Sequence, residues 1–165
     1  MLCDFGGTMN GYCSDITRCV FTGDVAPDVA EAYAVLHEAQ AAAVAAATVG
    51  TPCQDVDRAA RRAIADAGYG EYFVHRTGHG IGLEEHEDPY IVEGNATPLE
   101  AGHALSIEPG IYVRARGHAP RGHRRRRHRR SDRDEHGRPR FARRRRLIGV
   151  ASGVSVRAPV SRRTT

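Results

Sequence analysis

The chain has 165 residues, enough for one domain, and all 24 of its basic residues are arginine. The formal net charge of +4 is the sum of two segments of opposite charge. Residues 1–113 hold 5 arginines and 17 acidic residues, a charge of −12. Residues 114–165 hold 19 arginines and 3 acidic residues, a charge of +16. No run approaches the roughly 20 apolar residues of a membrane helix, and the N-terminus lacks the basic and apolar regions of a signal peptide. The four cysteines show no CxxC or zinc-ribbon spacing. We therefore expect reduced thiols, no membrane partner and a cytoplasmic protein.

Residues 1–22 are predicted to form a β-hairpin. An apolar start leads into the glycine-rich turn signal of residues 6–11, and the β-prone run from Tyr12 to Phe21 follows. Gly23 ends this run.

Two helices are predicted next, over residues 27–47 and 53–67. In the first, apolar residues recur at helical spacing, and Gln40 is the one polar break in that stripe. The second is shorter, with one apolar face and Gly68 as its stop signal: Val56, Ala60 and Ile64.

Short apolar runs alternate with glycine and proline over residues 72–113, which indicates strands and loops. The fold class is therefore α+β. After Val113 the arginine-rich segment 114–165 has no apolar periodicity until Leu147. Such a segment buries too little apolar surface to offset its ordering entropy, so we expect a disordered tail.

Six side chains of the first segment could carry chemistry. They occupy the two arms of the hairpin and the segments HRTGHGIGLEEHEDPY and SIEPGIY: Asp4, Asp15, His75, His79, His86 and Glu108. Singly, an aspartate beside a turn usually caps it, and a lone histidine is usually a polar surface residue. Together, they suit a site for divalent Mn, Co or Zn, where two ions sharing carboxylates could activate a water and polarise a carbonyl. No HExxH, GxSxG or P-loop motif is present to support the commoner hydrolase or nucleotide-binding classes.

Three motifs follow one another in residues 1–113: DFGGTMNGYCSDITR, TGHGIGLEEHEDP and SIEPGIY. In this order they resemble the motifs of the pita-bread metallopeptidases, which include proline-specific aminopeptidases, prolidases and methionine aminopeptidases. The sequence HEDP at residues 86–89 looks more like the proline-directed branch. The resemblance implies a partial pita-bread fold, with a curved antiparallel sheet and flanking helices. It also implies peptide substrates with proline second, and it allows a homo-oligomer.

The resemblance further implies a role for each candidate residue. Four residues would be ligands of two metal ions, with Asp15 bridging both: Asp4, Asp15, His79 and Glu108. His75 and His86 would contact the substrate and the reacting centre. The plainer alternative for these two histidines is hydrogen bonding within their loop.

Two departures from the family pattern predict that the chain as written is inactive. The family's catalytic domain begins well before its first aspartate ligand, whereas that aspartate is residue 4 here, so an upstream half-domain is expected to be missing. The family also has a final glutamate, bridging both metals, in an RxED-type strand soon after EPG. No such strand follows Tyr112, and Glu135 lacks the flanking residues.

Two alternatives from other classes remain open. One is a non-catalytic binding protein on the same fold, against which the presence of the four ligand residues argues. The other is a nucleic-acid-binding protein that uses the arginine-rich tail to neutralise phosphates. Because Phe141 is the only aromatic residue after Tyr112, that binding would be non-specific and sensitive to salt.

The composition of the tail also indicates translation in a shifted reading frame. Residues 118–129, HAPRGHRRRRHR, can be encoded so that the same bases, read one position later, give Met-Arg-Leu-Glu-Asp-Ile-Val-Val-Val-Val-Thr-Asp. This shifted sequence contains the missing RxED strand at the expected distance from Glu108. We therefore expect a frameshift near residues 113–115, with residues 114–165 translated out of frame.

Overall fold

The computed structural model describes residues 1–114, 147–151 and 154–157. The chain divides into two compact units, one formed by residues 1–112 and 149–165 and the other by residues 113–148. Most of the predicted disordered tail lies outside the described residues, and so does nearly all of the second unit. The first unit holds all six candidate residues.

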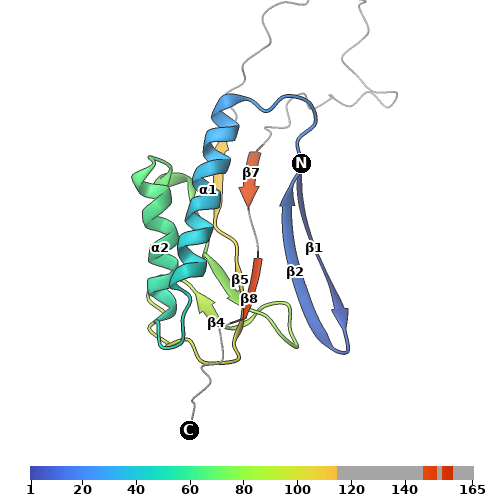
Figure 1. Ribbon diagram of the computed structural model, residues 1–165, viewed down its shortest axis with the longest axis vertical. Helices are drawn as coiled ribbons and strands as arrows, with labels where there is room; N and C mark the ends of the chain where they lie inside the picture. The colour runs from blue at the N-terminus through green and yellow to red at the C-terminus, as the bar shows by residue number, and fades with distance from the viewer. Residues whose placement is uncertain (115–146, 152–153, 158–165) are drawn as a thin grey trace, which may run out of the picture. The chain divides into compact units, whose positions relative to one another are not determined.

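The N-terminal hairpin forms as predicted, from β1 (Leu2–Met9) and β2 (Tyr12–Cys19). The strands pair antiparallel from Leu2 opposite Cys19 to Met9 opposite Tyr12 (Figure 1). Asn10 and Gly11 form the turn with φ of 53° and 84°, conformations that suit an asparagine–glycine hairpin turn. The turn is thus confined to the last two residues of the predicted signal, and residues 6–9 extend β1.

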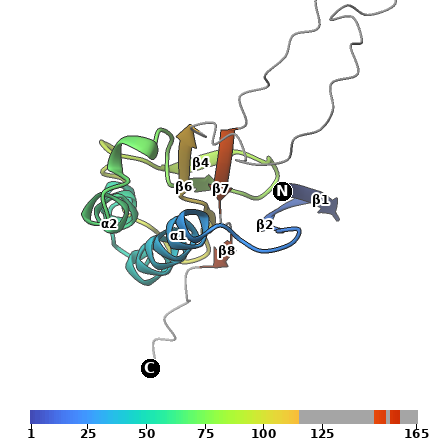
Figure 2. The ribbon, with the colours of Figure 1, turned by 90° about the horizontal axis from the view of Figure 1, so that it is seen from above.

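Helices α1 (Pro27–Ala46) and α2 (Cys53–Asp66) also form as predicted and pack against each other (Figure 2). The buried side chains of α1 are mostly small: Ala32, Leu36, Ala39, Gln40 and Ala43. The polar break in this stripe has a structural cause, because Gln40 Nε2 donates to the carbonyl oxygen of Ile107, 3.1 Å away. The hydrogen bond from Gln40 thereby holds α1 against the strand that contains Ile107.

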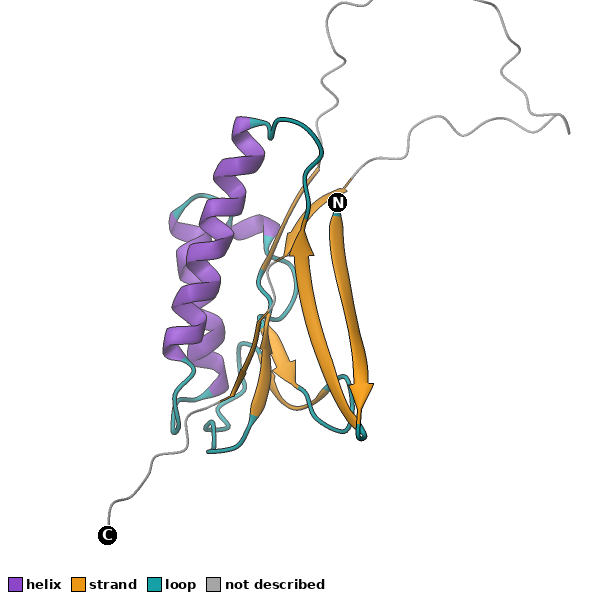
Figure 3. Ribbon diagram, turned by 45° about the vertical axis from the view of Figure 1, so that its right-hand side comes forward, coloured by secondary structure: helices purple, strands orange, loops and turns teal. Residues whose placement is uncertain are grey.

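The central sheet has the strand order β4-β3-β5-β8. Its members are β3 (Gly78–Gly80), β4 (Glu87–Ile91), β5 (Ala104–Ile107) and β8 (Val154–Arg157), and the paired strands run antiparallel. β6 (Gly110–Arg114) pairs with β7 (Leu147–Ala151), and a short 3-10 helix spans Gly70–Tyr72. Figure 3 shows the helices together on one side of the strands, with α2 contacting β4 and α1 contacting β5.

The described fold is α+β, as the sequence predicts, with one difference in the tail. Disorder is expected there, but β7 and β8 lie within it, where apolar and β-branched residues interrupt the arginine-rich sequence. The four cysteines are free thiols in the structure. No helix among the described residues is long and apolar enough to cross a membrane.

Candidate metal centre

The hairpin presents two aspartates on one face. Asp4 lies opposite Thr17, and Asp15 lies opposite Gly6, two positions along. Residues two positions apart point to the same side of a strand, so Asp4 and Asp15 are diagonal neighbours. Asp4 is exposed and accepts a hydrogen bond from Thr17 Oγ1 at 2.9 Å, whereas Asp15 is partly buried.

Two hydrogen bonds from Cys13 to backbone carbonyls connect β2 to the histidine-rich segment. The amide nitrogen of Cys13 donates to the carbonyl oxygen of Gly82 at 2.7 Å, and Cys13 Sγ donates to that of Leu83 at 3.7 Å. Gly82 and Leu83 follow β3, the strand that carries His79. These contacts therefore place the aspartate face of the hairpin beside His79.

His79 is fully buried in the middle of the sheet, where β3 pairs with both β4 and β5. Its Nδ1 lies 2.9 Å from the carbonyl oxygen of Gly80, where it can only donate a proton. Nε2 of the neutral imidazole then carries a lone pair. It lies 2.9 Å from Glu108 Oε1 and 3.6 Å from Asp15 Oδ2, yet it is buried without a hydrogen-bond partner.

Asp15, His79 and Glu108 each offer a ligand atom to one small group, and these atoms lie within 4.8 Å of one another. Glu108 directly follows β5, and its amide donates to the carbonyl oxygen of Thr77 at 2.8 Å. A buried imidazole lone pair facing two carboxylates is unfavourable, and either a proton on Nε2 or a divalent cation between the three groups relieves it. A histidine whose other ring nitrogen donates to a backbone carbonyl is the usual arrangement of a metal ligand, so the donor set fits a divalent ion.

The electrostatics of the group also favour a compensating positive charge. Burial raises the pKa of Asp15, and the Glu108 and Asp4 carboxylates raise it further. Burial lowers the pKa of His79, but Glu108 and the Gly80 carbonyl outweigh burial, so the net pKa of His79 is raised. Burial opposes ionisation of Glu108, but His79 and the Ser106 hydroxyl outweigh it, so the net pKa of Glu108 is lowered.

The remaining predicted residues lie near this group but outside it. The structure does not bring the ligand atoms of Asp4 into the group, although its charge acts on Asp15. His86 is exposed and stacks edge-on against His79, with the ring centroids 4.2 Å apart. His75 packs edge-on against Tyr112, with the ring centroids 5.3 Å apart, and its Nδ1 lies 2.6 Å from the carbonyl oxygen of Arg76.

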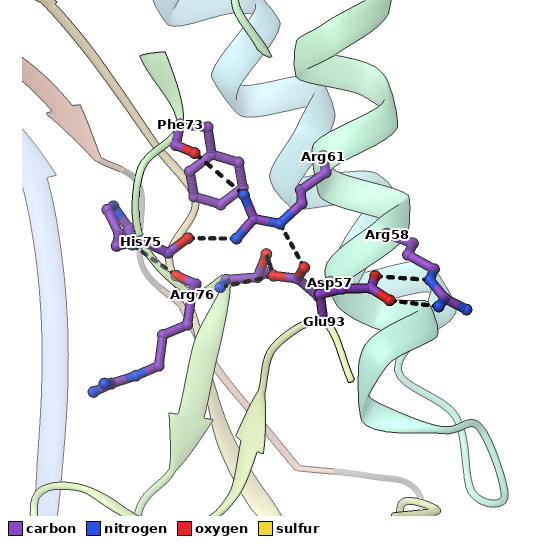
Figure 4. A network of polar contacts seen from close by, with 8 residues as sticks. Asp57, Arg58, Arg61, Phe73, His75, Arg76 and Glu93 are labelled. Carbon is purple, nitrogen blue, oxygen red and sulfur yellow. Dashed lines mark hydrogen bonds and ion pairs between the residues drawn. The ribbon is translucent and has the colours of Figure 1, made fainter. Parts of the chain in front are cut away.

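A buried ion pair on α2, which the sequence analysis did not identify, holds the segment that leads into β3 (Figure 4). Asp57 is fully buried and pairs with Arg61, with Nε and Oδ2 2.5 Å apart. Asp57 Oδ1 accepts hydrogen bonds from the amide and the hydroxyl of Thr77, at 3.1 and 2.7 Å. Arg61 donates to the carbonyl oxygens of Phe73 and His75. The pair thereby fixes the backbone on both sides of His75.

The only sequence signal for this pair is its spacing. Asp57 and Arg61 are four residues apart, and Asp57 adjoins the buried face of α2. The spacing predicts a helical pair but not its buried partner, Thr77. Ser106 was missed as well, although it lies opposite His79 in the β3–β5 pairing and is buried.

Comparison with known proteins identifies the fold and the family. Residues 1–151 match metallopeptidase family M24. The chain belongs to this family. The crystal structure of a recombinant prolidase from Thermococcus sibiricus superposes with a TM-score of 0.75 at 35% identity, covering 96% of this chain and 35% of the prolidase. The prediction of a partial pita-bread fold is confirmed.

Two relatives show how much of a longer protein this chain represents. The probable dipeptidase PepE of Mycobacterium tuberculosis is 54% identical over 114 residues, which are 68% of this chain and 30% of PepE. The Xaa-Pro dipeptidase of Lactobacillus delbrueckii subsp. lactis is 50% identical over 113 residues, which are 68% of this chain and 31% of that protein. The chain spans about a third of the length of these relatives.

Proposed function

We propose that residues 1–112 contribute most of the metal ligands of a dinuclear exopeptidase that hydrolyses a peptide bond next to proline. One observation carries this proposal: the ligand atoms of Asp15, His79 and Glu108 lie within 4.8 Å of one another, with His79 Nε2 buried and without a hydrogen bond. Membership of family M24 supports a metal-dependent hydrolase. The names of the relatives, a probable dipeptidase and an Xaa-Pro dipeptidase, support the substrate class.

Each side chain has a proposed role. Asp4, Asp15, His79 and Glu108 would hold the divalent ions, which would be Mn, Co or Zn. When bound, the ions supply Lewis-acid activation of a water and of the peptide carbonyl. His86, exposed beside His79, exchanges a proton with the reacting atoms or stabilises the oxyanion. His75 contacts the peptide.

The chain as written is proposed to have negligible turnover. The RxED strand, with the glutamate expected to bridge both metals, is absent from the sequence after Tyr112. Losing a shared carboxylate removes one ligand from each ion and leaves the repulsion between the ions less compensated. We propose that residues 114–165 are an out-of-frame translation of the segment that contains this strand. The free cysteines are consistent with a proposed cytoplasmic location.

Metal uptake by the purified chain tests the ligand assignment. Electron paramagnetic resonance of free Mn²⁺ should show weak uptake that Glu108→Gln abolishes. Glu100→Gln is the matched control, since Glu100 is exposed and outside the group. Uptake that is unchanged in Glu108→Gln would refute the assignment, and no uptake at all would favour a non-catalytic binding protein. Cleavage of Gly-Pro at about 1 s⁻¹ or faster would contradict the proposed inactivity.

A further inference from the structure

Thr77 is a fully buried residue, directly before β3, that forms hydrogen bonds to three other parts of the fold. Its hydroxyl and its amide both donate to Asp57 Oδ1 on α2, at 2.7 and 3.1 Å. The amide also donates to the carbonyl oxygen of Ile91, the last residue of β4, at 3.0 Å. The carbonyl oxygen of Thr77 accepts from the amide of Glu108, the residue after β5. Thr77 therefore connects α2, β4 and the end of β5.

Two members of the candidate metal group, His79 and Glu108, are attached to Thr77. His79 follows Thr77 by two positions along the chain. Glu108 is attached through the hydrogen bond of 2.8 Å from its amide to the Thr77 carbonyl oxygen. A displacement of the Thr77 backbone would therefore change the distance between His79 Nε2 and Glu108 Oε1, which is 2.9 Å.

A buried carboxylate holds Thr77 in place. Asp57 is fully buried, and its second oxygen pairs with Arg61 Nε, so the carboxylate cannot rotate without breaking that ion pair. Figure 4 shows both side chains reaching from α2 toward the segment that carries His75. A hydrogen bond to a charged acceptor is stronger than one between neutral groups, and a buried carboxylate that loses a donor is unfavourable. Both effects favour a single position of Thr77.

We propose that Thr77 is a positioning residue for the candidate metal group: held by Asp57, its carbonyl oxygen determines where Glu108 lies relative to His79. This inference rests on the proposed function, because that function makes Glu108 and His79 metal ligands. The hydroxyl of Thr77 is directed to Asp57, so Thr77 acts through its backbone and is not itself a ligand.

Substitutions that change only the hydroxyl group test this role. Thr77→Val keeps the shape of the side chain and removes the donor to Asp57, whereas Thr77→Ser keeps the donor. Nuclear magnetic resonance measures amide hydrogen exchange of the metal-free chain in the presence of a chelator. The Glu108 amide should exchange about 5- to 10-fold faster in Thr77→Val than in the wild type, the loosening expected from the loss of one hydrogen bond. Thr77→Ser should restore the wild-type rate.

Two controls separate positioning from a general loss of stability. The amide of Ile81 donates to the carbonyl oxygen of Ala104 at 3.0 Å, so its exchange should be unchanged in the same samples. Ile64→Val removes a buried methyl group from α2 but no hydrogen-bonding group, and it should leave the ratio of Glu108 to Ile81 exchange unchanged. Asp57→Asn weakens the same hydrogen bonds from the acceptor side and should accelerate exchange at Glu108, so the test does not depend on the folding of Thr77→Val.

Mn²⁺ uptake measures the consequence for the metal group. Thr77→Val should bind Mn²⁺ about 10-fold more weakly than the wild type, the lower end of the range for residues that orient metal ligands. Thr77→Ser and Ile64→Val should bind Mn²⁺ as the wild type does. Electron paramagnetic resonance of free Mn²⁺ gives the affinities.

Each outcome decides the role of Thr77. Equal acceleration of exchange at Glu108 and Ile81 in Thr77→Val would show that the hydroxyl only stabilises the fold, and it would overturn the proposal. Unchanged exchange at Glu108, or unchanged Mn²⁺ affinity in this variant, would overturn it as well. A wild-type chain that takes up no Mn²⁺ would overturn the metal centre, and selective acceleration at Glu108 would then still support the positioning of Glu108 by Thr77.

Discussion

Gly78 is the residue at which the β3–β5 pairing depends most directly on the absence of a side chain. A Cβ atom there would lie 1.8 Å from the carbonyl oxygen of Ser106, a distance that no relaxation of a flexible side chain can relieve. Gly78→Ala should therefore lower the free energy of unfolding by ~1–3 kcal/mol, as overpacking does, and should weaken Mn²⁺ uptake because His79 is the next residue. Urea denaturation and Mn²⁺ titration measure the two effects.

Gly7→Ala provides the control for this substitution. Gly7 also lies in a strand, but a Cβ there would have no neighbour within 4 Å. The urea unfolding midpoint of Gly7→Ala should stay close to that of the wild-type chain. If Gly78→Ala were as stable as Gly7→Ala, the close approach of β3 to β5 would be refuted.

The sequence identified residues that the structure brings together, but it did not predict their geometry. Asp15, His79 and Glu108 were singled out from their residue types and motifs, and the structure brings them together. It could not be predicted that Asp4 lies outside the group, because that depends on how the hairpin docks.

At the scale of elements, α2 positions the candidate site through one buried ion pair. Arg61→Met would leave Asp57 buried and without its partner, while Thr77 would lose part of the network that fixes it. Breaking a buried pair from one side costs about 3–5 kcal/mol, and the 34% exposure of the Arg61 side chain reduces our expectation to about 2–3 kcal/mol. Urea denaturation measures the loss.

Arg58→Met serves as the reference for this measurement, because Arg58 lies on the same helix and its ion pairs with Asp55 and Glu93 are exposed to solvent. Exposed pairs contribute little to stability, so this variant should unfold close to the wild type. Equal unfolding midpoints for the two variants would show that the Asp57–Arg61 pair does not hold the loop before β3.

Elements with a strong periodic signal were predicted, and the three-residue strand β3 was not. The hairpin and both helices form within a few residues of their predicted bounds, since each carries its own turn, stop or periodic pattern. β3 consists of Gly78, His79 and Gly80, residues with little β propensity, and it exists because its neighbours pair with it on both sides. Only tertiary structure reveals such a strand.

At the scale of the whole molecule, the composition changes after residue 113, from a formal charge of −12 over residues 1–113 to +16 over residues 114–165. The two curated relatives match 113 or 114 residues, and the acidic segment ends at about residue 113. If a frameshift is the cause, the bases that encode residues 118–129 should read Arg-x-Glu-Asp-Ile-Val one position later. Sequencing the gene with its flanks decides this, and codons incompatible with the shifted reading would refute the frameshift.

Completing the chain tests the assigned roles together. The part of the Mycobacterium tuberculosis relative that lies outside its match with this chain can be fused to residues 1–113 together with the shifted-frame strand. The fusion should gain metal-dependent cleavage of Xaa-Pro dipeptides, because the bridging glutamate and the supporting structure are then present. Metal analysis and steady-state kinetics are measured on the same preparations.

In this fusion, Asp15→Asn should abolish activity and strip metal, because it removes a charged ligand. His86→Ala should lower kcat by about 10²–10⁴-fold, the range of general acid–base and oxyanion groups, with metal content unchanged. The two variants should differ in metal content because His86 stacks on His79 but contributes no atom to the ligand group. Loss of metal in His86→Ala would make His86 a ligand, and unchanged kcat would make it an ordinary loop residue.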